Sequence, residues 1–250
     1  MTVFLWVIVP YLCLAVFAVG HVWRYRYDKF GWTTRSSQLY EDRLLRLGSP
    51  LFHFGMLGVV GGHVIGLLIP RSWTEAVGID DHLYHYVAVI GGLVAGVVAL
   101  VGMAILVYRR RTVGPVFSAT TPMDKVMYAF LVVVILLGLA NTLGWHAPGI
   151  NNLGGPAEHY NYREGVSIWY RQFLTFHPDA DLMAAAPLGF QLHTLVACIL
   201  FALWPFTRLV HVFSAPLGYV TRPYIVYRSR DRRPGAGVGS RAPQRGWEKV

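Results

Sequence analysis

Residues 49–70 read SPLFHFGMLGVVGGHVIGLLIP. This stretch contains no Asp, Glu, Lys or Arg, so His53 and His63 are its only ionisable side chains. At about 1.5 Å per helical residue, roughly 20 residues are enough to cross a hydrocarbon core of about 30 Å. The apolar run is continuous rather than alternating, which indicates a helix and not a strand of a membrane barrel. The stretch therefore predicts a membrane-spanning helix.

The rest of the chain repeats this pattern. Stretches free of Asp, Glu, Lys and Arg cover residues 3–23, 50–69, 83–108, 126–145 and 183–207. Of the 250 residues, 54% are hydrophobic and only 14% are charged, whereas soluble domains carry roughly a quarter charged residues. This composition excludes a disordered chain and argues against a water-soluble one. We expect an all-α integral membrane protein in which five transmembrane helices form a bundle.

The basic residues gather on one side of these spans. Nineteen of the 22 Lys and Arg residues lie in the first and third connections, in the tail or at the helix ends beside them, and only Arg71, Arg163 and Arg171 lie on the other side. The positive-inside rule then places the N-terminus outside and the C-terminus in the cytoplasm. The net charge of +9 is therefore read as a marker of sidedness, and no nucleic acid partner is expected.

Two parts of the chain look different from the spans. Residues 228–250 are rich in Arg, Gly and Pro, which predicts a basic cytoplasmic tail that is disordered unless bound, beside a membrane domain of residues 1–227. In the outer connection, residues 146–182, apolar side chains follow helical spacing and predict a short amphipathic helix along the outer surface. They are Val166, Trp169, Tyr170, Phe173 and Leu174.

Three histidines, His53, His63 and His193, lie in the second and fifth apolar segments, and His211 lies just beyond Arg208 at the end of the fifth. These segments cross the membrane in opposite directions, so His63 and His193 share the outer depth and His53 and His211 share the inner depth. A separation of eighteen residues is five turns at about 100° per residue, which would put His193 and His211 on one face of one helix. His53 and His63 would lie about 15 Å apart along their helix, whereas His193 and His211 would lie about 27 Å apart along theirs. Helix tilt, a bent end near Pro205 and the width of the ligated rings have to absorb the difference.

Paired histidines from facing helices are how a helix bundle holds haem, with both axial positions filled. The glycines around them allow two interpretations: close helix packing through Gly58 with Gly62 and Gly62 with Gly66, or room beside the helix for a flat macrocycle. From the spacing alone, the alternatives to two haems are a proton relay, a single metal site and plain interhelical hydrogen bonds. The two cysteines lie inside apolar runs and indicate neither a disulfide framework nor a thiolate metal site.

Several motifs together resemble the membrane cytochrome b subunit, or gamma subunit, of respiratory nitrate reductase. The matching residues are RY at 24–25, GWTTRSSQ at 31–38, LFH at 51–53 with GH at 62–63, ATT at 119–121, LH at 192–193 and PFTRLVHVFS at 205–214. The resemblance implies a five-helix protein with two b-type haems, the outer held by His63 and His193 and the inner by His53 and His211. It agrees with the pairing obtained from helix direction.

The resemblance also implies an activity. Quinol, commonly menaquinol, would be oxidised on the outer side of a bacterial or archaeal plasma membrane. Electrons would pass inward to an iron–sulfur subunit and then to a molybdenum subunit that reduces nitrate. A related subunit of a sulfur-reducing or heterodisulfide-reducing complex is the alternative. A transporter or proton channel is disfavoured because no acidic residue lies within the apolar segments, and a bare anchor would leave the four histidines unexplained.

Quinol oxidation needs a proton acceptor near the outer haem. We predict that His82 or His85, beside Asp80, Asp81 and Tyr84, helps to bind quinol, since neutral imidazole accepts protons near working pH. Simple anchoring of the helix at the interface is the alternative.

Some members of the family resembled use a lysine in this region, where Arg71 is the only basic residue of this chain. On the inner side, one of Arg109, Arg110, Arg111 and Arg208 would pair with a haem propionate, or all would serve as ordinary positive-inside anchors.

Overall fold

The computed structural model describes residues 1–32, 37–144 and 160–214, and every regular element in these ranges is helical. Five helices are long and apolar enough to cross a membrane, as expected of a multi-pass membrane protein. They span Phe4–Tyr27, Arg43–Leu68, Asp81–Thr112, Pro122–Leu143 and Leu188–Phe206. The prediction of five spans in an all-α protein is therefore confirmed. The orientation of the termini stays a prediction, and the tail, residues 228–250, lies outside the described residues.

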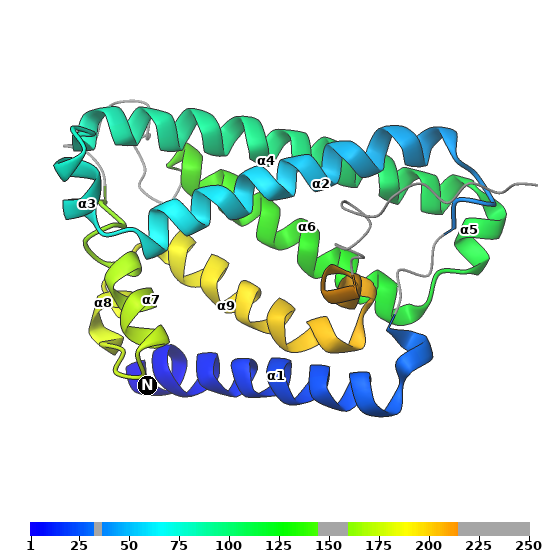
Figure 1. Ribbon diagram of the computed structural model, residues 1–250, viewed down its shortest axis with the longest axis horizontal. Helices are drawn as coiled ribbons and strands as arrows, with labels where there is room; N and C mark the ends of the chain where they lie inside the picture. The colour runs from blue at the N-terminus through cyan, green and yellow to red at the C-terminus, as the bar shows by residue number, and fades with distance from the viewer. Residues whose placement is uncertain (33–36, 145–159, 215–250) are drawn as a thin grey trace, which may run out of the picture. The chain divides into compact units, whose positions relative to one another are not determined.

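Shorter elements extend or join these helices (Figure 1). With the spanning helices included, the described elements in chain order are η1 (Phe4–Ile8), α1 (Val9–Tyr27), η2 (Lys29–Gly31), α2 (Arg43–His63), η3 (Val64–Leu68), α3 (Arg71–Ala76), α4 (Asp81–Thr112), α5 (Gly114–Ser118), α6 (Pro122–Leu143), α7 (Val166–Leu174), α8 (Ala180–Ala184), α9 (Leu188–Leu203), η5 (Trp204–Phe206) and η6 (Arg208–Ser214).

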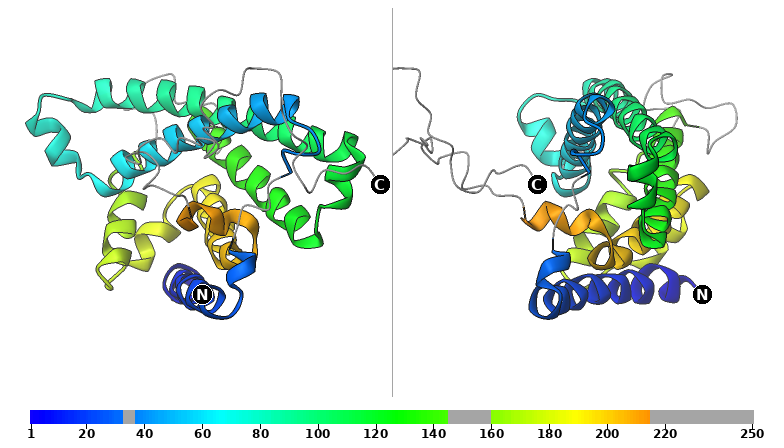
Figure 2. Two further views of the ribbon diagram at one scale, coloured as in Figure 1. Left: turned by 45° about the vertical axis from the view of Figure 1, so that its right-hand side comes forward. Right: turned by 90° about the vertical axis from the view of Figure 1, so that its right-hand side faces the viewer.

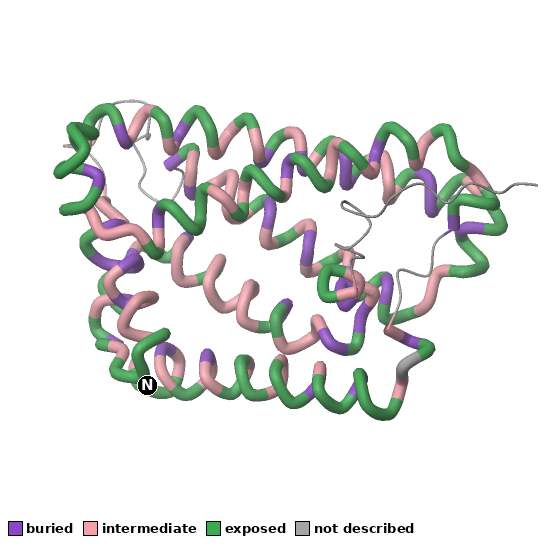
Figure 3. Tube along the Cα trace, in the orientation of Figure 1, coloured by how far each residue is buried: buried purple, intermediate pink, exposed green. Residues whose placement is uncertain are grey.

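The spanning helices form two pairs joined by a single helix. Helix α2 packs along α4, and α1 packs along α9, while α6 packs against both α4 and α9 (Figures 1 and 2). Among the described residues, α2 makes no extensive contact with α9. The outward sides of the helices are largely exposed (Figure 3), with apolar side chains such as Leu12, Val19 and Val22 along α1, as contact with lipid requires.

Small residues let α2 and α4 approach closely. A Cβ atom added to Gly55 would lie 2.4 Å from the backbone nitrogen of Ala99, and one added to Gly58 would lie 2.9 Å from Ala95 Cβ. Gly62 has nothing within 4 Å of such an atom, because α2 and α4 diverge toward this end (Figure 1). The predicted small-residue packing is therefore confirmed at Gly58 and wrong at Gly62.

This close contact gives a stability test. Gly55→Ala is expected to lower the melting temperature of the detergent-solubilised protein, because overpacking of a tight contact costs about 1–3 kcal/mol. Gly91→Ala, a control in the partner helix α4, is expected to leave the melting temperature unchanged or raise it, because alanine favours helix and a Cβ atom there meets nothing within 4 Å. Equal melting temperatures for the two variants would contradict this account of α2–α4 packing.

The fifth span differs most from the prediction. Met183 lies in the separate helix α8 and is fully buried, and α9 begins only at Leu188, after Pro187. Beyond η5, Thr207 is extended, with φ −112° and ψ 177°, before the chain enters η6. His211 therefore lies on a separate 3-10 helix, and its expected position five turns along the same face of one helix is wrong. The predicted bend near Pro205 is confirmed, and it removes the mismatch between the two histidine separations.

The predicted short helix of the outer connection is confirmed as α7. Trp169, one of its apolar residues, is buried, and its indole N–H donates a hydrogen bond of 3.0 Å to the carbonyl of Trp6. The hydroxyl of Tyr11 donates to the carbonyl of Phe173 at 2.9 Å. Helix α7 is thus fastened to the first spanning helix by two long-range hydrogen bonds.

Candidate functional site

The structure brings together both of the histidine pairs that the sequence predicts. The rings of His63 and His193 have centroids 6.0 Å apart and planes 23° from parallel. The centroids of His53 and His211 are also 6.0 Å apart, with planes at 70°. An imidazole nitrogen lies roughly 2 Å from a bound metal, and the ring centre lies about 1 Å farther, so two imidazoles on opposite sides of one metal have centres roughly 6 Å apart. Both pairs have this separation.

Three of the four rings are oriented by the backbone of their own helix. The Nδ1 atom lies 2.7 Å from the Ser49 carbonyl in His53, 2.8 Å from the Val59 carbonyl in His63 and 2.7 Å from the Arg208 carbonyl in His211. A carbonyl only accepts, so Nδ1 must carry the hydrogen and donate it. The lone pair then lies on Nε2, which is the tautomer that metal-ligating histidines show when a backbone carbonyl holds the other ring nitrogen.

His193 is placed by a glycine of α6. A Cβ atom added to Gly138 would lie 3.2 Å from Cε1 and 3.6 Å from Nδ1 of the His193 ring. Any larger residue at this position would press on the imidazole. The sequence analysis did not single out Gly138, because one glycine in an apolar helix carries no signal until its neighbour on another helix is known.

The surroundings of His63 are free of close side-chain packing. Helices α2 and α9, which carry the outer pair, do not pack closely on one another, and Gly61 and Gly62 beside His63 would meet nothing within 4 Å if they carried a Cβ atom. The described residues contain no cluster of three or more His, Cys, Asp or Glu that could hold a bare metal ion. Two axial imidazoles suit a metal whose other ligands come from a macrocycle, so the residues present fit haem.

The break in the chain before His211 is held by the C-terminal end of α1. Arg24 is buried, and its guanidinium donates to the Pro205 carbonyl at 2.7 Å and to the Gly31 carbonyl at 3.0 Å. A Cβ atom on Gly20 would lie 2.8 Å from Pro205 Cγ, so α1 approaches the break in the fifth span closely. The carbonyl freed where the helix stops is thereby satisfied by a charged donor.

A buried ion pair holds the other side of η6. Arg208 contacts both carboxylate oxygens of Asp124 on α6, at 2.9 and 3.0 Å. Asp124 also forms a capping box with Thr121 at the start of α6. From the sequence, Arg24 and Arg208 are predictable only as basic residues of one membrane side, and Asp124 carries no signal of its own. No local pattern predicts a bond between residues so far apart in the chain.

The chain matches the family model described as nitrate reductase gamma subunit over residues 2–230. It belongs to the nitrate reductase gamma subunit family. Among its relatives in this family, it is 45% identical to the nitrate reductase gamma chain of Bacillus subtilis, covering 90% of this chain and 97% of that one. It is 34% identical to the respiratory nitrate reductase 2 gamma chain of Escherichia coli, covering 92% and 98%.

A third relative is longer. The chain is 57% identical over 242 residues to the nitrate reductase-like protein NarX of Mycobacterium tuberculosis. The aligned region covers 97% of this chain but only 35% of that protein. The chain thus spans about a third of the length of this relative.

In this gamma-subunit family member, the residues proposed for a quinol site lie at the start of α4. The rings of His82 and His85 have centroids 4.8 and 5.8 Å from that of Tyr86. The neighbouring acidic residues have structural roles, because Asp80 accepts from the Leu83 N–H at the helix start and Asp81 pairs with Arg71 at 2.6 Å. The role of the two histidines stays a prediction.

The arginines at the C-terminal end of α4 bind protein groups. Arg109 is buried and donates to Glu41 at 2.6 Å and to the Ser37 hydroxyl at 2.8 Å. Partial burial opposes ionisation of Glu41, but hydrogen bonds from the Leu44 N–H and from Arg109 outweigh it and lower the pKa of Glu41. Arg110 donates to the Tyr128 hydroxyl at 2.8 Å. These contacts fasten the first connection and α6 to the C-terminal end of α4.

Proposed function

We propose that the chain is the quinol-oxidising membrane cytochrome b subunit of a respiratory nitrate reductase, with two b-type haems. One observation carries the proposal. His63 lies beside His193, and His53 beside His211, each with ring centroids 6.0 Å apart. Among the described residues, α2 and α9 make no extensive contact with each other. His63 and His193 would hold the outer haem, and His53 and His211 the inner one.

Haem at each pair would supply one-electron redox chemistry, and with both axial positions filled it would transfer electrons rather than bind oxygen. The residues of this chain orient the ligands: carbonyls of Ser49, Val59 and Arg208 hold three of the imidazoles with Nε2 directed away from the helix backbone. The apolar helices exclude water from the space between them.

The sidedness of the proposal follows the distribution of charge, with the N-terminus outside and the C-terminus in the cytoplasm. Quinol, commonly menaquinol in the family, would be oxidised at the outer side of a bacterial or archaeal plasma membrane. The electron acceptor would be a cytoplasmic iron–sulfur subunit, which passes electrons to a molybdenum subunit where nitrate is reduced. The printed names of the Bacillus subtilis and Escherichia coli relatives support nitrate reductase as the complex.

The deciding experiment is a reduced-minus-oxidised spectrum of the purified membrane protein, combined with haem quantification. Two b-type haems per chain are expected, and a preparation from native membranes with no haem would overturn the proposal. Mass spectrometry of the subunits that copurify identifies the complex. A molybdenum subunit and an iron–sulfur subunit are expected, whereas subunits of a sulfur-reducing or heterodisulfide-reducing complex would contradict the assignment to nitrate reductase.

The proposed quinol site gives a separate kinetic prediction. Quinol oxidation is expected to fall roughly a hundredfold in the His82→Ala, His85→Ala double variant, which is within the usual effect of removing a general base. The haem content and the extent of reduction by dithionite should stay native. His177→Ala is the control, because His177 is an exposed histidine outside the spanning helices. A double variant with the native rate would remove His82 and His85 from the quinol site.

A further inference from the structure

The turn directly after His63 is not an ordinary α-helix. Helix α2 ends at His63, and residues Val64–Leu68 form the π-helix η3, after which Ile69 is extended with φ −83° and ψ 116°. A π-helical turn carries one more residue than an α-turn, so its hydrogen bonds are shifted and some carbonyls lose their usual partners. Such turns are uncommon and persist where other groups hold them.

The carbonyls at this turn are held by the outer segment, residues 160–174. The Ser167 hydroxyl donates to the Gly66 carbonyl at 2.8 Å, and an Arg171 Nη1–H donates to the Leu67 carbonyl at 3.1 Å. Ser167 is 0% exposed. A buried carbonyl that loses its donor is destabilising, so the hydroxyl favours the π-helical form of η3 in which this bond is made.

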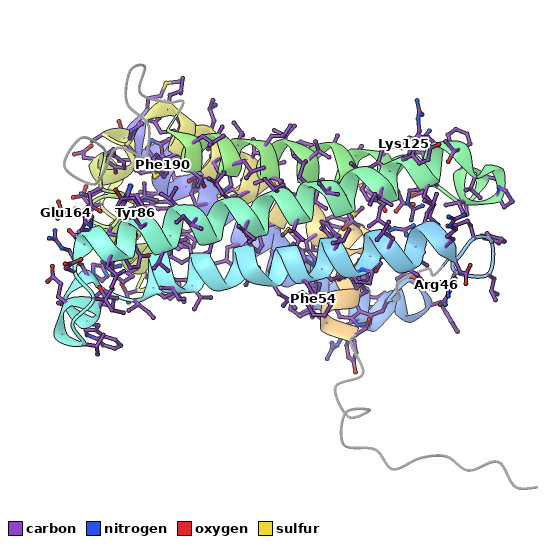
Figure 4. The ribbon with its side chains drawn as sticks, turned by 90° about the horizontal axis from the view of Figure 1, so that it is seen from above. Arg46, Phe54, Tyr86, Lys125, Glu164 and Phe190 are labelled. Atoms are coloured by element: carbon purple, nitrogen blue, oxygen red, sulfur yellow. The ribbon has the colours of Figure 1, made fainter. Side chains whose placement is uncertain are left out.

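The same segment also contacts the helix that carries the other outer histidine. Phe190 lies on α9, three residues before His193, and its ring stacks on that of Tyr162 with centroids 6.2 Å apart. The Tyr162 hydroxyl also lies against η3, since a Cβ atom on Gly66 would come within 2.7 Å of it. Figure 4 shows Phe190 and Glu164 at the same end of the bundle.

The outer segment therefore bridges two helices that do not pack on each other. It is itself anchored to the first span by the hydrogen bonds from Trp169 to Trp6 and from Tyr11 to Phe173. Because α2 and α9 lack extensive mutual contact, their separation at the outer end depends on what lies between them. At this end that element is the outer segment.

We propose that the outer segment positions the His63–His193 pair, with Ser167 as the positioning residue that keeps η3 π-helical. The inference rests on the proposed function, in which this pair holds the outer haem. Relaxation of η3 toward an α-helix would change the register by one residue, about 100° of rotation, immediately beside His63. Groups that orient a metal-bound histidine usually change metal affinity about 10–100-fold when they are lost.

The test is Ser167→Ala in the intact complex, with readouts on the haems themselves. The haem held by His63 and His193 is expected to pass to apomyoglobin roughly tenfold faster than in the native protein. The same haem should show an altered low-spin EPR signal and a shifted midpoint potential, while the other keeps its native values. Thr175→Ala is the matched control. It also removes a hydroxyl from this region, but that hydroxyl bonds the carbonyls of Arg171 and Gln172 on its own helix.

A second pair of variants separates positioning from general destabilisation. Arg171→Met removes the donor to the Leu67 carbonyl and should affect the same haem, whereas Arg171→Lys retains a donor and should restore the native signal. Native behaviour of both haems in Ser167→Ala would overturn the inference, and so would equal changes in both. Absence of haem from the native protein would instead overturn the proposed function, so the two failures are distinguishable.

Discussion

His63→Ala is expected to abolish the outer haem site while the inner site remains. Haem quantification should fall from two haems per chain to one, and quinol oxidation should fall at least about a hundredfold, as for loss of a metal-holding group. The physical reason is that His63 and His193 face each other across 6.0 Å, and no further His or Cys of the described chain gathers with them to replace a lost ligand.

The complementary variant makes this prediction specific. His53→Ala should remove the inner haem and leave the EPR signal of the outer haem native. The reason is that the His53 ring is paired with His211 and not with His193. His177→Ala, which changes an exposed histidine of the outer connection, should retain both haems. A haem that stays bound but becomes high-spin in His63→Ala would also support the assignment, since an axial ligand is lost. Two unaltered low-spin haems would contradict it.

Asp124→Ala is expected to cause the largest loss of stability. Asp124 and Arg208 have side chains only 3% and 13% exposed, and breaking a buried pair leaves an uncompensated charge that costs about 3–5 kcal/mol. The free energy of unfolding, measured by titration with a denaturing detergent, should fall by that amount. The spectrum of the inner haem should change as well, because Arg208 is the first residue of η6 and its carbonyl accepts a hydrogen bond from the His211 ring.

An exposed ion pair provides the control. Arg46 and Asp42 are 3.5 Å apart with side chains 72% and 55% exposed, and such pairs contribute about 0–1 kcal/mol. Asp42→Ala should therefore change the free energy of unfolding by no more than about 1 kcal/mol and leave both haem spectra native. If Asp124→Ala were no less stable than Asp42→Ala, the buried pair would not hold η6.

The sequence predicts the spans because lipid imposes a simple requirement. Any helix that crosses the membrane must be apolar over about 20 residues, and hydropathy reports this directly. The pairing of histidines also follows, since helix direction assigns a depth to each ring. The predicted start of the fifth span is wrong. Residues 183–207 contain no Asp, Glu, Lys or Arg, so composition does not reveal that Met183 belongs to α8.

The groups that orient the site were not predictable from local pattern. Arg24 binds the Pro205 carbonyl, 181 residues away in the chain, and Ser167 binds the Gly66 carbonyl, 101 residues away. An arginine at a helix end is expected as a positive-inside anchor, and a serine in a short amphipathic surface helix is expected to face solvent. Only the tertiary structure shows that each binds a carbonyl left free where a helix is interrupted.

The division of each histidine pair between distant spans has a consequence for how the protein is made. Each pair takes one member from the second spanning helix and the other from the fifth or from the segment after it. Neither pair exists until the last span has been synthesised and inserted. Under the proposed function, a haem with both axial ligands can therefore form only after synthesis of the last span.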